Sequence, residues 1–79
     1  MSVITLFTRQ GCHLCREAEK VLRCVVTHPD VIEVVDIDTD PSLTDRYTVR
    51  VPVVELDGAE IAQYHVDETA VRNALQSRL

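Results

Sequence analysis

Basic residues are scarce in this sequence. Lysine and arginine together number 8 against 13 aspartates and glutamates, and Lys20 is the single lysine. Binding along a phosphate backbone requires clustered lysine and arginine side chains, whereas this chain carries a net charge of −5. Nucleic acid is therefore excluded as an expected partner. The acidic surface favours solubility, or a partner with a basic face.

Long hydrophobic runs, repeats and low-complexity segments are also missing. No uninterrupted apolar run exceeds three residues, whereas a membrane-spanning helix needs about 20. The opening residues, MSVITLF, contain neither a basic segment nor a cleavage-site pattern, so no signal peptide is expected. We therefore predict a cytoplasmic location with no membrane contact, and we also expect a monomer. Residues 1–79 suffice for one small domain.

The sequence contains three cysteines, and two of them form a Cys-x-x-Cys motif at Cys12 and Cys15. An odd number argues against a secreted domain held together by disulfides. In the cytoplasm, where structural disulfides are rare, such a motif is more typical of redox or metal chemistry. The residues around the motif must separate these two interpretations.

Hydrophobic periodicity divides the chain into seven elements. Runs of β-branched residues predict strands, and apolar residues three or four apart predict helices. Asp67 is expected to cap the last helix, in which Ala70, Val71, Ala74 and Leu75 should face inward. The expected strands cover 3–7, 31–38, 51–56 and 59–64, and the first two helices cover 12–26 and 40–47.

The order of these elements predicts an α/β fold with a four-stranded mixed sheet flanked by helices. A strand–helix–strand unit at the start requires parallel strands and a right-handed crossover. Later in the chain, Asp57-Gly58 is a strong signal for a hairpin between antiparallel strands. Cys12 then follows the carboxyl end of the first strand, where open α/β sheets place their functional sites.

The position of Cys12 favours thiol–disulfide exchange. At the start of a helix, unpaired N–H groups and the helix dipole stabilise an anion, and Arg9, His13 and Arg16 add positive charge nearby. We therefore expect a thiol pKa below the ordinary value at Cys12, which makes it the nucleophile. Cys15 lies one turn further along the same helix face and is expected to be the resolving thiol.

Other interpretations of the cysteine pair differ in how well they fit. A c-type haem site needs histidine directly after the second cysteine, where this chain has Arg16. A structural zinc site usually has four ligands. The chain does not offer such a set, so we expect no zinc site within a single chain. A non-catalytic binding module, a metal or iron–sulfur site shared between two chains, and simple packing remain alternatives. Cys24 lies about 13 Å further along the helix, on the flank of the apolar stripe. It is expected to pack against the core, and the alternative is a side thiol open to modification or dimer formation.

Four segments carry a resemblance to a known family. They are TLFTRQGCHLC at 5–15, VVDID at 34–38, YTVRVPVV at 47–54 and DG at 57–58. With these segments the chain resembles the glutaredoxin branch of the thioredoxin fold, over nearly its whole length. The resemblance implies a βαβαββα thioredoxin fold and a thiol–disulfide oxidoreductase that reduces protein disulfides or glutathione mixed disulfides. It implies no bound cofactor, and it makes glutathione a candidate co-substrate.

The same resemblance assigns roles around the cysteines. It implies that Pro52 is cis and that Val51-Pro52 lies against the cysteines, with the Val51 backbone pairing with an extended substrate or with glutathione. The alternative from the residues alone is that Pro52 begins an edge strand. The further candidate substrate-binding residues are Arg9, His13, Arg50 and Asp67. For Arg9 and Arg50, a solvated surface role is the competing interpretation.

Two departures from the family pattern concern glutathione. Glutaredoxins that use glutathione generally have two glycines near the start of the last helix, whereas this chain has AQYHVDET at 62–69. Between the cysteines it has His13-Leu14 in place of the common Pro-Tyr. Both differences affect glutathione recognition and leave the dithiol chemistry intact. Tyr64 and His65 are expected to be loop residues first and substrate contacts second.

Overall fold

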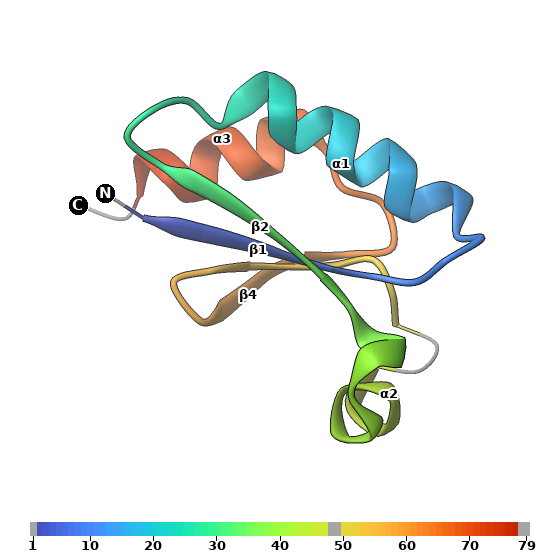
Figure 1. Cartoon of the computed structure of the whole chain (residues 1–79). Helices are drawn as coiled ribbons and strands as arrows, with labels where there is room; N and C mark the ends of the chain where they lie inside the picture. Colours follow the sequence, from blue (N-terminus) through green and yellow to red (C-terminus); the bar gives the residue numbers. More distant parts are fainter. Residues whose placement is uncertain (1, 48–49, 78–79) are drawn as a thin grey trace.

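The observed elements follow the expected βαβαββα order, with one short 3-10 segment added (Figure 1). The computed structural model describes residues 2–47 and 50–77. None of the helices within these residues is long and apolar enough to cross a membrane. The elements are β1 Val3–Thr8, α1 His13–Val25, β2 Val31–Asp36, η1 Ile37–Thr39, α2 Pro41–Tyr47, β3 Val53–Leu56, β4 Ala59–Gln63 and α3 Glu68–Gln76.

The four strands form a mixed sheet in the order β2-β1-β3-β4. Strand β1 runs parallel to β2, because α1 carries the chain back between them, and antiparallel to β3. Asp57 and Gly58 form the β3–β4 hairpin turn with φ angles of 50° and 91°. Positive φ at both turn residues matches the twist of the flanking strands, so the predicted hairpin and the mixed sheet are confirmed.

The sheet has a hydrophobic cluster on each face. Side chains alternate along β1, so Ile4 and Leu6 face α1 and α3 while Phe7 faces α2. Figure 1 shows α1 and α3 side by side over one face, with α2 on the other side near one end of the sheet. The larger cluster comprises Ile4, Leu6, Ala18, Leu22, Val54, Leu56 and Val71. The smaller one comprises Phe7, Ile37, Tyr47 and Val53.

Three local expectations were wrong. The second strand ends at Asp36 rather than at residue 38, because the Asp36 carboxylate accepts the Asp38 backbone N–H at 2.9 Å and turns the chain into η1. The third strand begins at Val53, two residues later than expected, since Pro52 has no N–H for the strand ladder. Ala70 is exposed, whereas the other three residues expected to face inward do so: Val71 is buried, and Ala74 and Leu75 pack partly buried against the larger cluster.

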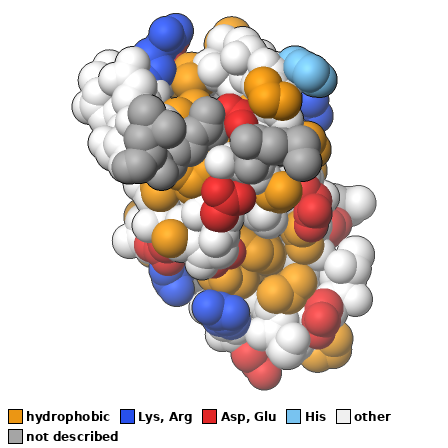
Figure 2. All heavy atoms as spheres, turned by 90° about the vertical axis from the view of Figure 1, so that its left-hand side faces the viewer, with side chains coloured by type: hydrophobic (Ala, Val, Ile, Leu, Met, Phe, Trp, Pro, Cys, Tyr) orange, Lys and Arg blue, Asp and Glu red, His pale blue; other side chains and the backbone are white. Residues whose placement is uncertain are grey.

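Part of the apolar surface remains open around the edge strand β2. Val3, Val31 and Val34 are 40%, 51% and 41% exposed. Figure 2 views the molecule from the end at which β1 begins, and hydrophobic side chains lie among acidic ones there. Because β2 has a neighbouring strand on one side only, it buries less apolar area than β1 and contributes less to the core.

Burial of Tyr47 predicts a loss of stability at high pH. The ring stacks on Phe7 at 4.4 Å between centroids, and its hydroxyl donates to the Glu55 carboxylate at 3.0 Å. Burial, and then the hydrogen bond to Glu55, raise the pKa of Tyr47 above its ordinary value of 10.0. A raised pKa stabilises the fold below the unfolded-state pKa, and this stabilisation is lost as the pH rises through the folded-state value.

We therefore expect the urea midpoint to fall as the pH rises above about 10. A Tyr47→Phe variant should lose this part of the pH dependence, although it is less stable at neutral pH. Tyr64→Phe, which changes an exposed tyrosine, is the control and should keep the decline. An equal decline in Tyr47→Phe and in the unmodified protein would contradict the assignment.

Candidate functional site

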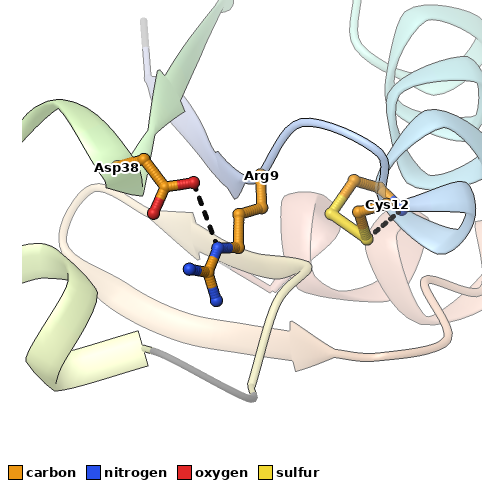
Figure 3. The surroundings of a disulfide bond; sticks show 4 residues. Arg9, Cys12 and Asp38 are labelled. Atoms are coloured by element: carbon orange, nitrogen blue, oxygen red, sulfur yellow. Dashed lines mark hydrogen bonds and ion pairs between the residues drawn. A yellow bond between two sulfur atoms is a disulfide. The ribbon is translucent and has the colours of Figure 1, made fainter.

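The cysteine pair lies where β1 passes into α1. Strand β1 ends at Thr8, and Gly11, with φ 78°, turns the chain toward the helix. Cys12 is the N-cap residue of α1, with extended backbone angles of −88° and 109°. Its Sγ accepts a hydrogen bond from the Cys15 backbone N–H at 3.1 Å (Figure 3). A sulfur atom therefore occupies the place where a helix most favours a negative charge.

Cys12 and Cys15 are joined by a disulfide, with their Cα atoms 5.2 Å apart. The two residues differ in accessibility, because Cys12 is half-buried whereas Cys15 is 2% exposed. Position in the helix explains the difference. Cys15 precedes Ala18 and Leu22 on the face that packs on the sheet, while Cys12 lies outside the first turn. An incoming sulfur can therefore approach Cys12 more easily than Cys15.

Val51-Pro52 lies at the same end of the sheet as the cysteine loop. Phe7 of β1 pairs with Val53 of β3, so the chain that leaves β1 toward Cys12 runs beside the chain that enters β3. The Val51-Pro52 peptide bond is cis, as the resemblance implied. Pro52 is buried and Val51 is half-buried. Residues 48–49 of the matching segment 47–54 lie outside the described residues.

Carboxylates hold both candidate arginines. The Arg9 Nε donates to Asp38 at 3.1 Å, and Figure 3 shows its side chain directed toward η1 rather than toward the disulfide. Arg50 is paired with the carboxylate of Glu60, and its Nε also donates to Gln63 at 3.2 Å. The structure thus gives each arginine a partner within the chain.

His13 and Asp67 lie at the starts of two helices. His13 is the first residue of α1, its side chain is 74% exposed, and its Nε2 is 3.7 Å from the Glu17 carboxylate. Asp67 is the N-cap of α3 and accepts the Thr69 backbone N–H at 3.3 Å, as predicted for a capping residue. Only Asp67 of these two lines the pocket described next.

An open pocket of about 400 Å³ has one wall on α1 that includes Leu14, which lies between the two cysteines in the sequence. Helix α1 provides one wall, and the segment between β4 and α3 provides the other. The sequence does not indicate this pocket, because it places Leu14 between the cysteines and Tyr64 and His65 mainly in a loop. No local pattern marks a cavity between two walls so far apart in the chain. The lining residues are Leu14, Glu17, Ala18, Tyr64, His65, Val66 and Asp67.

Cys24 is exposed and outside the disulfide, so the expectation that it packs against the core was wrong. It follows Leu22 by two helix positions, which places it about 200° around α1 from that buried side chain. Within residues 2–47 and 50–77, no three histidine, cysteine, aspartate or glutamate side chains converge as metal ligands. The candidate site therefore consists of the Cys12–Cys15 disulfide and the pocket on the same helix.

Comparison with known proteins agrees with this geometry. The model of the glutaredoxin-like domain (DUF836) family matches residues 3–76. A glutaredoxin-like protein of Dictyostelium discoideum, the YDR286C homolog, is 31% identical in an alignment of 83 positions that covers 96% of this chain and 77% of that protein.

Solved structures extend the likeness to the fold. A structural genomics target from X. campestris matches with a TM-score of 0.78 and 31% identity, over 96% of this chain and 99% of that one. A mutant thioredoxin from Halobacterium salinarum matches with a TM-score of 0.71 and 26% identity, over 96% and 73%. The chain therefore has a thioredoxin fold and belongs to the glutaredoxin-like domain (DUF836) family.

Proposed function

We propose that this protein is a thiol–disulfide oxidoreductase that cycles between the Cys12/Cys15 dithiol and the disulfide. One observation carries the proposal: an accessible cysteine at the N-cap of α1 is joined to a buried cysteine one turn inward. A disulfide that served only to staple the fold would gain little here, because it closes a loop between residues only three positions apart.

The proposed reaction transfers two electrons to the substrate. The Cys12 thiolate attacks one sulfur of a substrate disulfide, forms a mixed disulfide and displaces the first substrate thiolate, which takes up a proton. The Cys15 thiol then loses its proton and attacks the Cys12 sulfur, which releases the second substrate thiol and closes the Cys12–Cys15 disulfide. The substrate is reduced, and the protein is left in the oxidised form seen in the structure.

The local geometry favours a thiolate at Cys12. When the disulfide is reduced, the Cys15 backbone N–H that already points at the Cys12 sulfur can donate to the anion. The first backbone N–H groups of α1 add to this effect, because no carbonyl of the preceding turn accepts from them. Cys15 stays buried and thiol-like until the mixed disulfide brings a sulfur within its reach.

We propose protein disulfides or glutathione mixed disulfides as substrates, with the Val51 backbone pairing with an extended substrate chain. His13 and Asp67 would lie beside such a chain. Arg9 and Arg50 would first have to leave Asp38 and Glu60 to bind a substrate carboxylate. Electrons would come from glutathione or from a protein dithiol, no bound cofactor would be needed, and the protein would act as a cytoplasmic monomer.

A defined glutathione buffer tests this proposal. After acid quenching, intact mass spectrometry of the oxidised protein should show the loss of two hydrogens, which corresponds to the Cys12–Cys15 disulfide. In a Cys15→Ser variant, a glutathione adduct at Cys12 should persist, and glutathione-dependent turnover would identify glutathione as the electron donor. A disulfide without any adduct would point to a protein dithiol instead. If neither the disulfide nor the adduct formed, the proposal would be wrong.

A further inference from the structure

Each wall of the pocket is connected to the redox site. On α1, Leu14 lies between the two cysteines in the sequence, and Ala18 lies one turn further along. Figure 1 shows the segment that joins β4 to α3 passing alongside α1. Within that segment, the Tyr64 backbone N–H donates to the Pro52 carbonyl at 2.9 Å. One wall of the pocket therefore begins between the two cysteines, and the other is hydrogen-bonded to Pro52.

The lining combines apolar walls with carboxylates. Ala18 is 1% exposed, and Leu14 and Val66 are half-buried. Glu17 and Asp67 contribute the carboxylates, and none of the seven lining residues is lysine or arginine. A pocket with apolar walls and two carboxylates fits a side chain that has an aliphatic stem and a cationic head. It suits a carboxylate-rich ligand poorly, because like charges repel.

The Glu17 carboxylate contacts His13 and Lys20 only loosely, and an incoming cation would replace these contacts. Its side chain is 51% exposed, and its neighbours His13 and Lys20 approach at 3.7 and 3.9 Å, longer than a normal hydrogen bond. Asp67 is held by its capping bond to Thr69, so its position at the pocket is fixed by α3. One carboxylate can thus adjust to a ligand while the other is held in place.

Tyr64 adds an aromatic wall with a fixed backbone. Its φ of 63° lies in the left-handed region that favours glycine, yet the residue is tyrosine. Strain of this kind persists where surrounding structure imposes it, here through the hydrogen bond to Pro52. Its side chain lines the pocket and is 40% exposed. Tyrosine rings attract cations that lie over their faces.

We infer that this pocket binds a lysine or arginine side chain of the substrate protein, located within two residues of the cysteine that Cys12 attacks. The inference rests on the proposed function, since it names the substrate class of the same site. The chain's net charge of −5 agrees with it, because an acidic protein attracts basic partners from a distance. The pocket would then choose among disulfides by their neighbouring residues.

The test uses three peptides that carry the same cysteine in a mixed disulfide with mercaptoethanol and differ only in the flanking residues. These residues are arginine, glutamine or glutamate. The reduced protein should release mercaptoethanol from the arginine peptide about fivefold faster than from the glutamine peptide at low salt, and more slowly still from the glutamate peptide. The preference should shrink at high ionic strength.

Two variants of α1 with the same change in charge distinguish binding in the pocket from attraction of basic peptides by the net negative charge of the protein. Glu17→Gln should bring the arginine-to-glutamine rate ratio close to one. Glu19→Gln removes an equal charge from the same helix, outside the pocket, and should keep the ratio. Because each ratio compares two peptides on one protein, a change in folding or in overall activity cancels.

Each outcome bears on one of the two proposals. Equal rates for the three peptides, or a ratio that survives Glu17→Gln, would overturn the pocket inference while reduction of the glutamine peptide upholds the oxidoreductase. A ratio lost equally in both variants would also overturn it, since the preference would then come from net charge. If the unmodified protein reduces none of the peptides, the proposed function itself is wrong and the pocket inference fails with it.

Discussion

A Cys12→Ser variant is expected to reduce no disulfide faster than the reaction without protein. Serine has the size of cysteine and can still cap α1, so the fold should survive the change. It cannot form a mixed disulfide, and the remaining thiol of the motif, Cys15, is 2% exposed. Measurement of thiol release from a small neutral disulfide, with circular dichroism to confirm folding, tests this expectation.

A Cys15→Ser variant should fail at a different step. Cys12 can still attack, so one equivalent of thiol is released rapidly and the mixed disulfide then accumulates. Intact mass should show the substrate fragment covalently bound, and digestion should locate it at Cys12. If the fragment were found at Cys24 instead, or if Cys12→Ser kept its turnover, the assignment of nucleophile and resolving thiol would be wrong.

Cys24→Ser is the matched control for both variants. Cys24 is exposed and lies on α1 like Cys15, so the exchange removes a thiol without changing the core, and turnover should be unchanged.

In the reduced Cys24→Ser variant, Cys12 is the remaining accessible thiol, so the rate of alkylation at Cys12 can be measured against pH. Its rate should persist at lower pH than that of a free thiol, whose pKa is about 8.5. A profile like that of a free thiol would contradict the helix argument.

The parts of the fold that sequence predicts best are those with a strong local signal. The apolar stripe through Ala18 and Leu22 predicts α1, and Asp57-Gly58 predicts the hairpin, because each depends on residues close together in the chain. The position of Cys12 at a strand–helix junction follows from these elements. The burial of Cys15 also follows, because helical periodicity places it on the same face as Ala18 and Leu22.

The parts that sequence predicts poorly depend on distant contacts. Nothing near Arg9 indicates that Asp38 will hold it, and nothing near Glu17 indicates a pocket wall that contains Asp67. The exposure of Cys24 shows a further limit, since a residue on the flank of an apolar stripe is buried only if a neighbouring element covers it. In each case the missing information is which segments meet in space.

Among core substitutions, Leu22→Ala is expected to have one of the largest effects on stability. Leu22 is fully buried in the larger cluster, where α1 meets the sheet and Val71 of α3. Truncating a buried leucine to alanine costs about 2–5 kcal/mol, from lost burial and from the cavity left behind. Small domains are stable by only about 0.05–0.15 kcal/mol per residue, so a sizeable fraction of the variant should be unfolded. Urea denaturation with the disulfide intact measures the loss.

Leu75→Ala makes the same chemical change at a half-buried position on the rim of that cluster. It should cost less than half as much, because a partly exposed side chain loses less burial and leaves a space that water can fill. Equal losses in the two variants would show that α1 is not anchored through Leu22.

Because α1 also holds Cys12 at its start and Cys15 on its buried face, Leu22→Ala should additionally speed the alkylation of Cys15 in reduced protein. The larger cluster thus both stabilises the fold and maintains the difference between the two thiols on which the proposed reaction depends.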